Sequence, residues 1–342
     1  MNDANELISF IASMSGEGNL RVEENLGEGY VRLRVSEAER RQAKHDIQHV
    51  EDIVIEMLRN ARDAGADKVY LATTKEDGVR TLVFLDNGSG VPQDMQERIF
   101  DARVTSKLES MKMDHWGVHG RGMALFSIKQ NTDEARVVAS DVDLGSVFKV
   151  SVATDRLGER ADQSSWPQAV KDEDGHYVCA RGPHNIIRAA CEFALEELRA
   201  CDVYLGSPSE IAATLHAQAS SRLDASRLLF IDDEAELPVV DRLGLASDAE
   251  DFIRICSGLG LEMSERTAHR ILAGQIKPVR GVTARLLRER DSSSHASAPV
   301  DLAKDRRGLR IAKDDMAQFS RAVERDFNDL AARYYLTLCG DP

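Results

Sequence analysis

Residues 50–64 constrain the fold more than any other part of the chain, because their apolar side chains recur at the spacing of an α-helix. This apolar stripe consists of Val50, Ile53, Val54, Met57, Leu58, Ala61 and Ala64. A stripe of this kind buries one side of a helix against a sheet. Glu56, Asn60 and Asp63 fall outside it and, at about 100° per residue, project along one edge of the helix. That edge can face a pocket.

Two further segments place polar groups at the ends of predicted elements. Residues 81–85 have the composition of a β-strand, which Asp86-Asn87-Gly88-Ser89-Gly90 ends abruptly. A carboxylate at a strand end, followed by glycines, can accept a hydrogen bond from a planar ligand that approaches the backbone closely. The glycine run at 117–122 opens a predicted helix over 123–129, and backbone amides at such a helix start bind anions such as phosphate. Together these segments predict a nucleotide site.

In this order, Glu56-Met57-Leu58-Arg59-Asn60, Asp86-Asn87-Gly88-Ser89-Gly90 and the run from Gly117 to Gly122 resemble the GHKL ATPase superfamily, which has a Bergerat-type ATP-binding domain. This superfamily contains gyrase B subunits, heat-shock chaperones of the ninety-kilodalton class, sensor histidine kinases and the MutL mismatch-repair proteins. The resemblance covers roughly residues 40–155. It implies an α/β fold, a two-layer α/β sandwich in which helices cover a mixed sheet, followed here by a mostly helical C-terminal region.

The resemblance also implies a role for each matching residue. Glu56 would be the catalytic general base that activates water, and Asn60 would bind Mg²⁺ and so join the protein to the triphosphate of ATP. Asp63 would support these two residues, and Asp86 would bind the adenine amino group. Glycines would let the ligand approach the backbone, Gly88 and Gly90 at the base, and Gly117, Gly120 and Gly122 around the phosphates in a mobile lid. On an isolated helix Glu56 and Asn60 would be read as a solvated face, but the two downstream motifs favour the ATP site.

The predicted lid over residues 101–116 and its surroundings supply further candidates for ATP binding. Thr105 and Lys107 lie in a segment that resembles one found just before the glycine loop in several branches of the family. Lys107 and Arg121 carry charges suited to a phosphate, with a solvated loop position as the alternative for each. Ser146 stands where family members use a threonine near the adenine.

Composition places this 342-residue chain among globular proteins, with 42% hydrophobic residues and a net charge of −14. The acidity argues against a surface that coats nucleic acid throughout, but it permits a local basic patch. Five cysteines without a CxxC pair favour a reducing compartment over a disulfide framework or a structural zinc site. No signal-like segment opens the chain, and no run approaches about 20 apolar residues. We therefore expect a cytoplasmic protein without a membrane segment.

The length predicts more than one domain. In chain order, we expect an N-terminal arm (1–40), the ATP-binding domain (41–155), a connecting α/β region (156–248), a helix-turn-helix-like segment (249–290), and a linker with a C-terminal helix (291–342). In some relatives an N-terminal segment closes the ATP site of a partner subunit, which gives the hypothesis of a homodimer formed on nucleotide binding. The alternative is an extra strand on the protein's own sheet, for which residues 30–35 have the alternating pattern.

Local patterns predict several further elements. Residues 68–73 and 79–85 flank the turn Glu76-Asp77-Gly78 and predict an antiparallel hairpin. Other strands are expected at 135–140, 146–152 and 202–205. Other helices are expected at 7–14, 93–100, 185–199, 208–218 and 312–338.

Residues 264–274 resemble the recognition helix of a helix-turn-helix motif, with predicted helices at 250–257 and 282–290 on either side. The candidate DNA contacts are Arg266, Arg270, Lys277 and Arg280, with His269 beside them. The alternative is a small helical bundle whose basic face is solvated.

Two classes of function fit these patterns. The first is a Mg²⁺-dependent, slow ATPase whose nucleotide state controls conformation or dimerisation, with DNA as a candidate partner. The second is a protein kinase of the histidine-kinase or anti-sigma type, or a sensor that binds ATP without hydrolysing it. Glu56 and the Ala64-Gly65-Ala66 ending favour the gyrase, chaperone and mismatch-repair side of the superfamily. A histidine kinase also needs a long upstream hairpin that carries the acceptor histidine, and only 50 residues precede Glu51 here.

Overall fold

The computed structural model describes residues 22–106, 112–114, 117–119, 122–160, 162–198, 200–223, 233–287 and 321, with the backbone alone for 112–114 and 117–119. All of these except Arg321 belong to one compact unit within residues 1–290. The helices expected at 7–14 and 312–338 lie outside the described residues.

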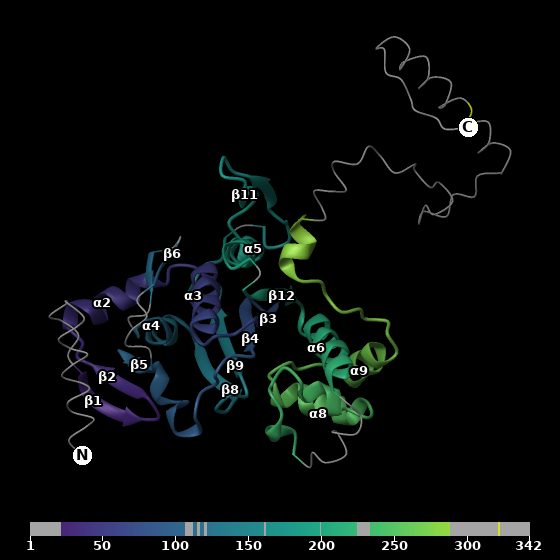
Figure 1. Cartoon of the computed structure of the whole chain (residues 1–342), viewed down its shortest axis with the longest axis horizontal. Helices are drawn as coiled ribbons and strands as arrows, with labels where there is room; N and C mark the ends of the chain where they lie inside the picture. Colours follow the sequence, from purple (N-terminus) through teal and green to yellow (C-terminus); the bar gives the residue numbers. More distant parts are fainter. Residues whose placement is uncertain are drawn as a thin grey trace, which may run out of the picture. The chain divides into compact units, whose positions relative to one another are not determined.

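A mixed five-stranded sheet with the order β12-β3-β4-β9-β8 forms the centre of this unit (Figure 1). β3 (Lys68–Glu76) and β4 (Val79–Asp86) form the predicted antiparallel hairpin. β9 (Ser146–Ala153) and β8 (Glu134–Ser140) extend the antiparallel part on the β4 side. β12 (Asp202–Gly206) pairs in parallel with β3 at the opposite edge. The mixed sheet that the sequence predicts is thereby confirmed.

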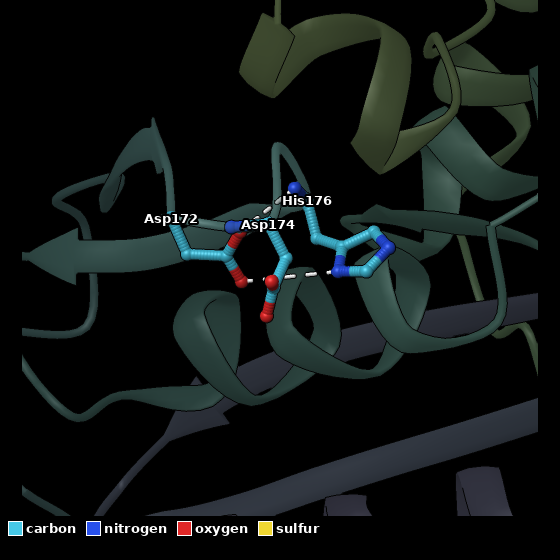
Figure 2. Close-up of side chains that lie close together, drawn as sticks. All are labelled: Asp172, Asp174 and His176. Atoms are coloured by element: carbon cyan, nitrogen blue, oxygen red, sulfur yellow. Dashed lines mark hydrogen bonds and ion pairs between the residues drawn. The ribbon is translucent and has the colours of Figure 1, made fainter.

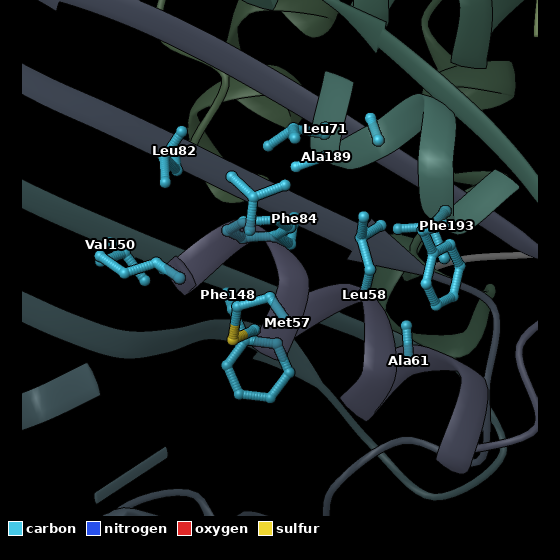
Figure 3. Packing of buried hydrophobic residues seen from close by; sticks show 14 of the residues in the cluster. Met57, Leu58, Ala61, Leu71, Leu82, Phe84, Phe148, Val150, Ala189 and Phe193 are labelled. Carbon is cyan, nitrogen blue, oxygen red and sulfur yellow. The ribbon is translucent and has the colours of Figure 1, made fainter. Parts of the chain in front are cut away.

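Helices α3 (Val50–Asp63) and α5 (Ile186–Glu196) pack on one face of this sheet, and Ile128 of α4 (Ala124–Asn131) joins the same core. Figure 3 shows the contact, with Met57 and Leu58 of α3 beside sheet side chains such as Phe84. Every predicted stripe residue from Val50 to Ala61 is buried. The hydrophobic periodicity of residues 50–64 therefore identifies the side of α3 that faces the sheet.

Helices α6 (Pro208–Arg222), α8 (Ala249–Gly258) and α9 (Glu265–Leu272) pack on the other face (Figure 1). Successive residues of a strand point to opposite faces, so Tyr70 and Ala72 of β3 contact these helices while Val69 and Leu71 contact the α3 side. The predicted α/β class is confirmed, and the helical C-terminal region lies against the second face of the sheet.

The N-terminal arm contributes a small separate sheet. β1 (Val22–Gly27) and β2 (Tyr30–Leu33) form a hairpin, and β2 pairs with β5 (Val104–Thr105) of the same chain. Among the described residues the arm therefore adds a strand within its own molecule, although to this small sheet and not to the central one.

Helix α2 (Glu37–Asp46) was not predicted, because it is strongly charged and buries only Ala43. Its signal lies at its start, where Ser36 and Glu39 form a capping box that satisfies backbone N–H groups. Such a box predicts a helix start even when no apolar stripe follows.

Two expectations in the middle of the chain were wrong in detail. Residues 93–100 form two short 3₁₀ turns, η1 (Gln93–Met95) and η2 (Arg98–Phe100), and not one helix. The helix expected at 123–129 is present as α4, but the first part of the glycine run, Gly117–His119, forms strand β7 against β6 (Lys112–Asp114). Gly122 has a φ of +67°, which is incompatible with an α-helix, so α4 begins only at Ala124.

The connecting region also holds an unexpected hairpin, formed by β10 (Gln168–Lys171) and β11 (Tyr177–Arg181). Beyond α6, two further 3₁₀ turns, η3 (Glu234–Glu236) and η4 (Arg242–Leu245), precede α8. A last helical turn over 282–287 buries Val282 and Leu286 in the core on the α5 side.

Candidate functional site

A cavity of about 630 Å³ opens beside the polar edge of α3. It brings together most of the residues predicted for the ATP site: Glu56, Asn60, Asp63, Asp86, Gly90, Thr105, Gly122 and Ser146. These come from five separated segments of the chain, which the fold places around one space. The apolar part of the lining includes Met57, Phe84 and Phe148, which also belong to the core.

The start and end of α3 are fixed by local hydrogen bonds. Asp52 accepts hydrogen bonds from the backbone N–H groups of Gln48 and His49, each at 2.8 Å, in the first turn. At the other end, Gly65 has a φ of +74°, and the N–H of Ala66 donates to the Ala61 carbonyl at 3.0 Å. Because both ends are fixed, the polar edge of α3 has a defined direction relative to the sheet.

Glu56 is held by a neighbour on its own helix. Nη1 of Arg59 donates to Oε1 of Glu56 at 2.8 Å, and the Arg59 side chain is 3% exposed while that of Glu56 is 22% exposed. Both residues line the cavity. The site thus has a carboxylate partly open to the cavity with a buried guanidinium behind it.

Asn60 lies one turn further along the same edge and also lines the cavity. Its amide nitrogen is buried and has no hydrogen-bond partner within the described part of the chain. A buried polar atom without a partner is rare in folded proteins, and ligand binding is one explanation for it. A side-chain amide can present either its oxygen or its nitrogen to a ligand.

Asp63 is buried at the end of this edge, with its side chain 4% exposed. Nε of Arg62 lies 3.1 Å from Asp63 Oδ1, and Nη1 of Arg62 lies 3.2 Å from Oε1 of Glu197 at the end of α5. Arg62 therefore joins the edge of α3 to the neighbouring helix.

The strand end at Asp86 packs directly onto the end of α3. Oδ1 of Asp86 accepts a hydrogen bond from the Gly88 N–H at 2.8 Å, and the Ser89 N–H donates to the Ala64 carbonyl at 2.9 Å. The Asn87 side-chain oxygen accepts from the backbone of Asp67 and Lys68. This turn holds the Asp86 carboxylate, 4% exposed, against the cavity.

Contacts within the protein give a further reason for the two glycines of this turn, beside the predicted approach of the ligand. A Cβ at Gly88 would lie 2.8 Å from the Ala64 carbonyl oxygen, and a Cβ at Gly90 only 1.8 Å from the Asp141 carbonyl oxygen. Gly90 also has a φ of +72° and lines the cavity, whereas Gly88 packs beneath the turn. Contacts within the protein, in addition to any ligand, therefore require glycine at both positions.

Ser146 lies at the start of β9 in the cavity wall, buried, with its Oγ 3.2 Å from Oγ of Ser140. Ser140 in turn accepts from the Val91 N–H at 2.7 Å and donates to the Gly145 carbonyl at 2.8 Å. The hydroxyl predicted near the adenine is thus part of a small network that joins the β8–β9 loop to the turn after β4.

The structure describes only some of the remaining predicted residues. Thr105 and Gly122 line the cavity, and the backbone of Gly117 forms part of β7. Lys107, Gly120 and Arg121 lie outside the described residues.

Sequence reasoning missed two parts of the cavity wall, Arg59 and the N-terminal segments. Tyr30 of β2 and Gln42 and Asp46 of α2 all line the cavity. Burial raises the pKa of Tyr30, and a hydrogen bond with Ser106 opposes that shift. For Arg59 a signal existed, because a glutamate and an arginine three residues apart on a helix are neighbours. For the N-terminal segments none did, since their approach depends on distant strand pairing.

The candidate DNA contacts lie on and after α9. Arg266, Arg270, Lys277 and Arg280 are all exposed, while Ala268 and Ile271 of α9 are buried against the sheet side. Arg266, His269 and Arg270 border a shallow hollow on this helix together with Glu265. The fold therefore places basic side chains on an outward surface, as both alternatives for this segment require.

A second cluster of polar groups closes the β10–β11 hairpin, where Asp172, Asp174 and His176 lie close together on the surface (Figure 2). Oδ1 of Asp172 accepts from the backbone N–H groups of Asp174, at 3.0 Å, and His176, at 2.8 Å. These bonds are those of a tight turn, and they account for the aspartate at its first position.

A mixed sheet covered by helices, with Glu56, Asn60 and Asp63 along one helix edge and Asp86 at the end of a strand beside the same cavity, is the arrangement expected from the resemblance to the GHKL class. Similarity to known proteins agrees, since the family described as "Histidine kinase-, DNA gyrase B-, and HSP90-like ATPase" matches residues 47–140. Residues 47–140 therefore form a GHKL-type domain by similarity, and ATP binding is supported at the level of that family.

Among individual proteins, the chain is similar to the DNA mismatch repair protein MutL of Staphylococcus aureus. The proteins of strains Newman, JH1 and Mu3 are each 35% identical to it over 98 residues. The match covers 28% of this chain and 14% of the relatives' length, so the chain matches a small part of each of them. In the part of the chain that the structure describes, no helix combines the length and the apolar character needed to cross a membrane.

Proposed function

We propose that this protein binds ATP with Mg²⁺ in the cavity beside α3 and hydrolyses it slowly, in a cycle that controls conformation or dimerisation. The observation that carries the proposal is the convergence of Glu56, Asn60 and Asp86 on one cavity within a GHKL domain. A volume of about 630 Å³ suits a ligand of nucleotide size.

We assign adenine binding to one end of the cavity and hydrolysis to the other. Asp86, fixed by Gly88, accepts the hydrogen bond of the adenine amino group, with Ser146 beside it. At the other end, Glu56 accepts a proton from the attacking water, because a carboxylate open to the cavity can act as a general base. The phosphates are assigned to Thr105, Gly122 and the glycine run, together with Lys107 and Arg121.

The donor set fits Mg²⁺, which prefers oxygen ligands and keeps several waters when one or two protein groups and substrate phosphates bind it. Asn60, with its amide lacking a full set of partners among the described residues, would hold the ion, close to Glu56. When bound, the ion supplies positive charge that offsets the charge of the phosphates.

The test is ATP turnover by the purified chain beside Glu56→Gln. Glutamine keeps a hydrogen-bond acceptor for the buried Arg59 but cannot take up a proton, so binding should persist while hydrolysis falls at least about a hundredfold. Turnover at the wild-type rate would show that Glu56 is not the base. Binding without turnover in the wild type would instead favour the alternatives, a sensor or a protein kinase, and labelled phosphate on a protein acceptor would identify the kinase.

A DNA partner is a second part of the proposal, supported by the exposed basic residues on and after α9 in a chain of net charge −14. A cationic helix face suits phosphate contacts and the major groove. Arg266→Glu/Arg270→Glu should weaken binding of duplex DNA at low salt by at least about tenfold. Lys171→Glu/Arg181→Glu on the β10–β11 hairpin changes the net charge equally and serves as the control. Equal losses in both variants, or no binding by the wild type, would remove DNA from the proposal.

Homodimer formation on nucleotide binding and a cytoplasmic location complete the proposal. The reason for the dimer is the resemblance to relatives in which an N-terminal segment closes the partner's ATP site; among the described residues of the arm, Tyr30 lines the cavity of its own chain. Light scattering with and without a non-hydrolysable ATP analogue tests it, and a monomer under both conditions would exclude it. The cysteine content, without a CxxC pair, supports the cytoplasm.

A further inference from the structure

Arg59 is a charged, buried cavity residue that has no role in the proposed ATP contacts. It lies between Glu56 and Asn60 on α3, lines the cavity, and is 3% exposed. Its Nη1 donates to Oε1 of Glu56 at 2.8 Å. A guanidinium keeps its charge at every physiological pH, so a buried one needs a carboxylate close by.

This hydrogen bond restricts the carboxylate that the proposed reaction uses. A glutamate side chain has three rotatable bonds, and Glu56 is only partly buried, so packing alone leaves it several orientations. A charge-assisted bond from a rigid, buried donor selects one of them. A carboxylate has about four acceptor positions, so the bond at Oε1 leaves it able to accept from a water as well.

We infer that Arg59 is a positioning residue for Glu56: it holds the carboxylate in the orientation in which it accepts the proton of the attacking water. The inference rests on the proposed ATPase function. In the step concerned, the water oxygen bonds to the γ-phosphorus while the bond from that phosphorus to the bridging oxygen breaks. The electron pair of that bond leaves with ADP, and the water proton passes to Glu56. Arg59 stays protonated throughout and touches neither water nor phosphate.

A positioning role predicts a particular pattern of kinetic effects. Arg59→Met keeps the length and the burial of the side chain but removes the donor, so kcat should fall by about tenfold to a hundredfold. KM for ATP should change by less than about threefold, because the binding groups remain. Arg59→Lys keeps a donor and a charge within reach of Glu56 and should recover part of the loss.

A double-mutant cycle separates positioning from direct action. If Arg59 acts through Glu56, Arg59→Met should have no further effect on turnover in a Glu56→Gln background. A full additional loss in the double variant would overturn the inference, since Arg59 would then act on the substrate or the fold. An unchanged kcat in Arg59→Met alone would overturn it equally.

The chain also offers a matched control for the loss of a buried arginine. Arg80 is 9% exposed on the same side of the sheet, donates from Nε to Oε2 of Glu159 at 2.8 Å, and does not line the cavity. Arg80→Met should lower the melting temperature without lowering the kcat of the folded fraction. If both arginine variants lost kcat in proportion to stability, the role of Arg59 would be structural and the inference wrong. A wild type that binds ATP without turnover would overturn the proposed function itself, which is a different result from turnover with additive effects.

Discussion

The two faces of the five-stranded sheet are both covered by helices, but they differ in what those helices bury. On the α3 side, Glu51, Arg59 and Asp86 are buried charged residues. Among the described residues of α6, α8 and α9, no charged side chain is buried, and Thr214 is a buried polar one. Apolar contacts such as those of Phe252 and Leu215 fill that second face instead.

This difference indicates that one face of the sheet carries the candidate site and that the other face stabilises the fold. A buried charge is costly even when it is paired, and replacement by apolar residues is often neutral or stabilising. Charges are therefore expected where they serve the chemistry of a site, and of the three named on the α3 side Arg59 and Asp86 line the cavity, whereas Glu51 does not. The second face, with its apolar core, stabilises the sheet from which that site is built.

The largest expected effect lies on the second face. Phe252 of α8 is fully buried, with its ring 5.5 Å from that of His216. Phe252→Ala should lower the free energy of unfolding by about 3–5 kcal/mol, because it removes apolar contacts and leaves a cavity. Urea unfolding measures this change, and Leu272→Ala, at a position 36% exposed, is the control, with an expected change within about 0.5 kcal/mol.

The comparison predicts that the folded fraction of Phe252→Ala binds ATP as the wild type does. Calorimetric titration below the unfolding transition provides that measurement. A dissociation constant raised more than about threefold, equivalent to roughly 0.65 kcal/mol, would mean that the two faces are coupled and that the division of tasks is incomplete.

A smaller effect is expected on the α3 side, from Asp86→Asn. The asparagine oxygen can still accept from the Gly88 N–H, so the turn should persist, but its amide nitrogen cannot accept a hydrogen bond from a ligand. Loss of a hydrogen bond to a charged group should weaken ATP binding by about tenfold to a hundredfold. Asp133→Asn, just before β8, changes an exposed aspartate outside the cavity and should leave the affinity unchanged. Equal affinities for wild type and Asp86→Asn would remove Asp86 from the nucleotide site.

The same contrast explains which parts of the molecule could be predicted from the sequence. The apolar stripe and polar edge of α3 follow from periodicity, and the Asp86 turn follows from the glycines that end β4. Both signals are local. The atoms that demand glycine at 88 and 90 belong to Ala64 and Asp141, which only the folded chain brings near. The placement of α8 and α9 on the second face depends likewise on long-range packing, which no local sequence motif predicts.

The smallest expected effect concerns a charge on the α3 side that lies away from the cavity. Glu159 follows β9 and pairs with Lys75 of β3 and Arg80 of β4. Burial alone would raise the pKa of Glu159, but hydrogen bonds from Lys75 and Arg80 outweigh burial, so its pKa lies below the ordinary value of 4.5. A carboxyl group whose pKa is lowered by folding stabilises the folded state above its unfolded pKa, and this contribution is lost as the pH falls through the folded value.

Glu159→Gln should therefore cost about 1 kcal/mol of unfolding free energy at pH 7, and the difference from wild type should shrink as the pH falls below about 4.5. Urea unfolding of both proteins at pH 7 and pH 4 measures it. Because Glu159 does not line the cavity, ATP affinity should stay at the wild-type value. A gap that stayed constant or widened at pH 4 would mean that the ionised carboxylate is not what stabilises this end of the sheet. Reduced ATP affinity would mean that the charged residues of the α3 side act as one network. The two faces of the sheet would then still differ in function, but the cavity could not be separated from the rest of the α3 side.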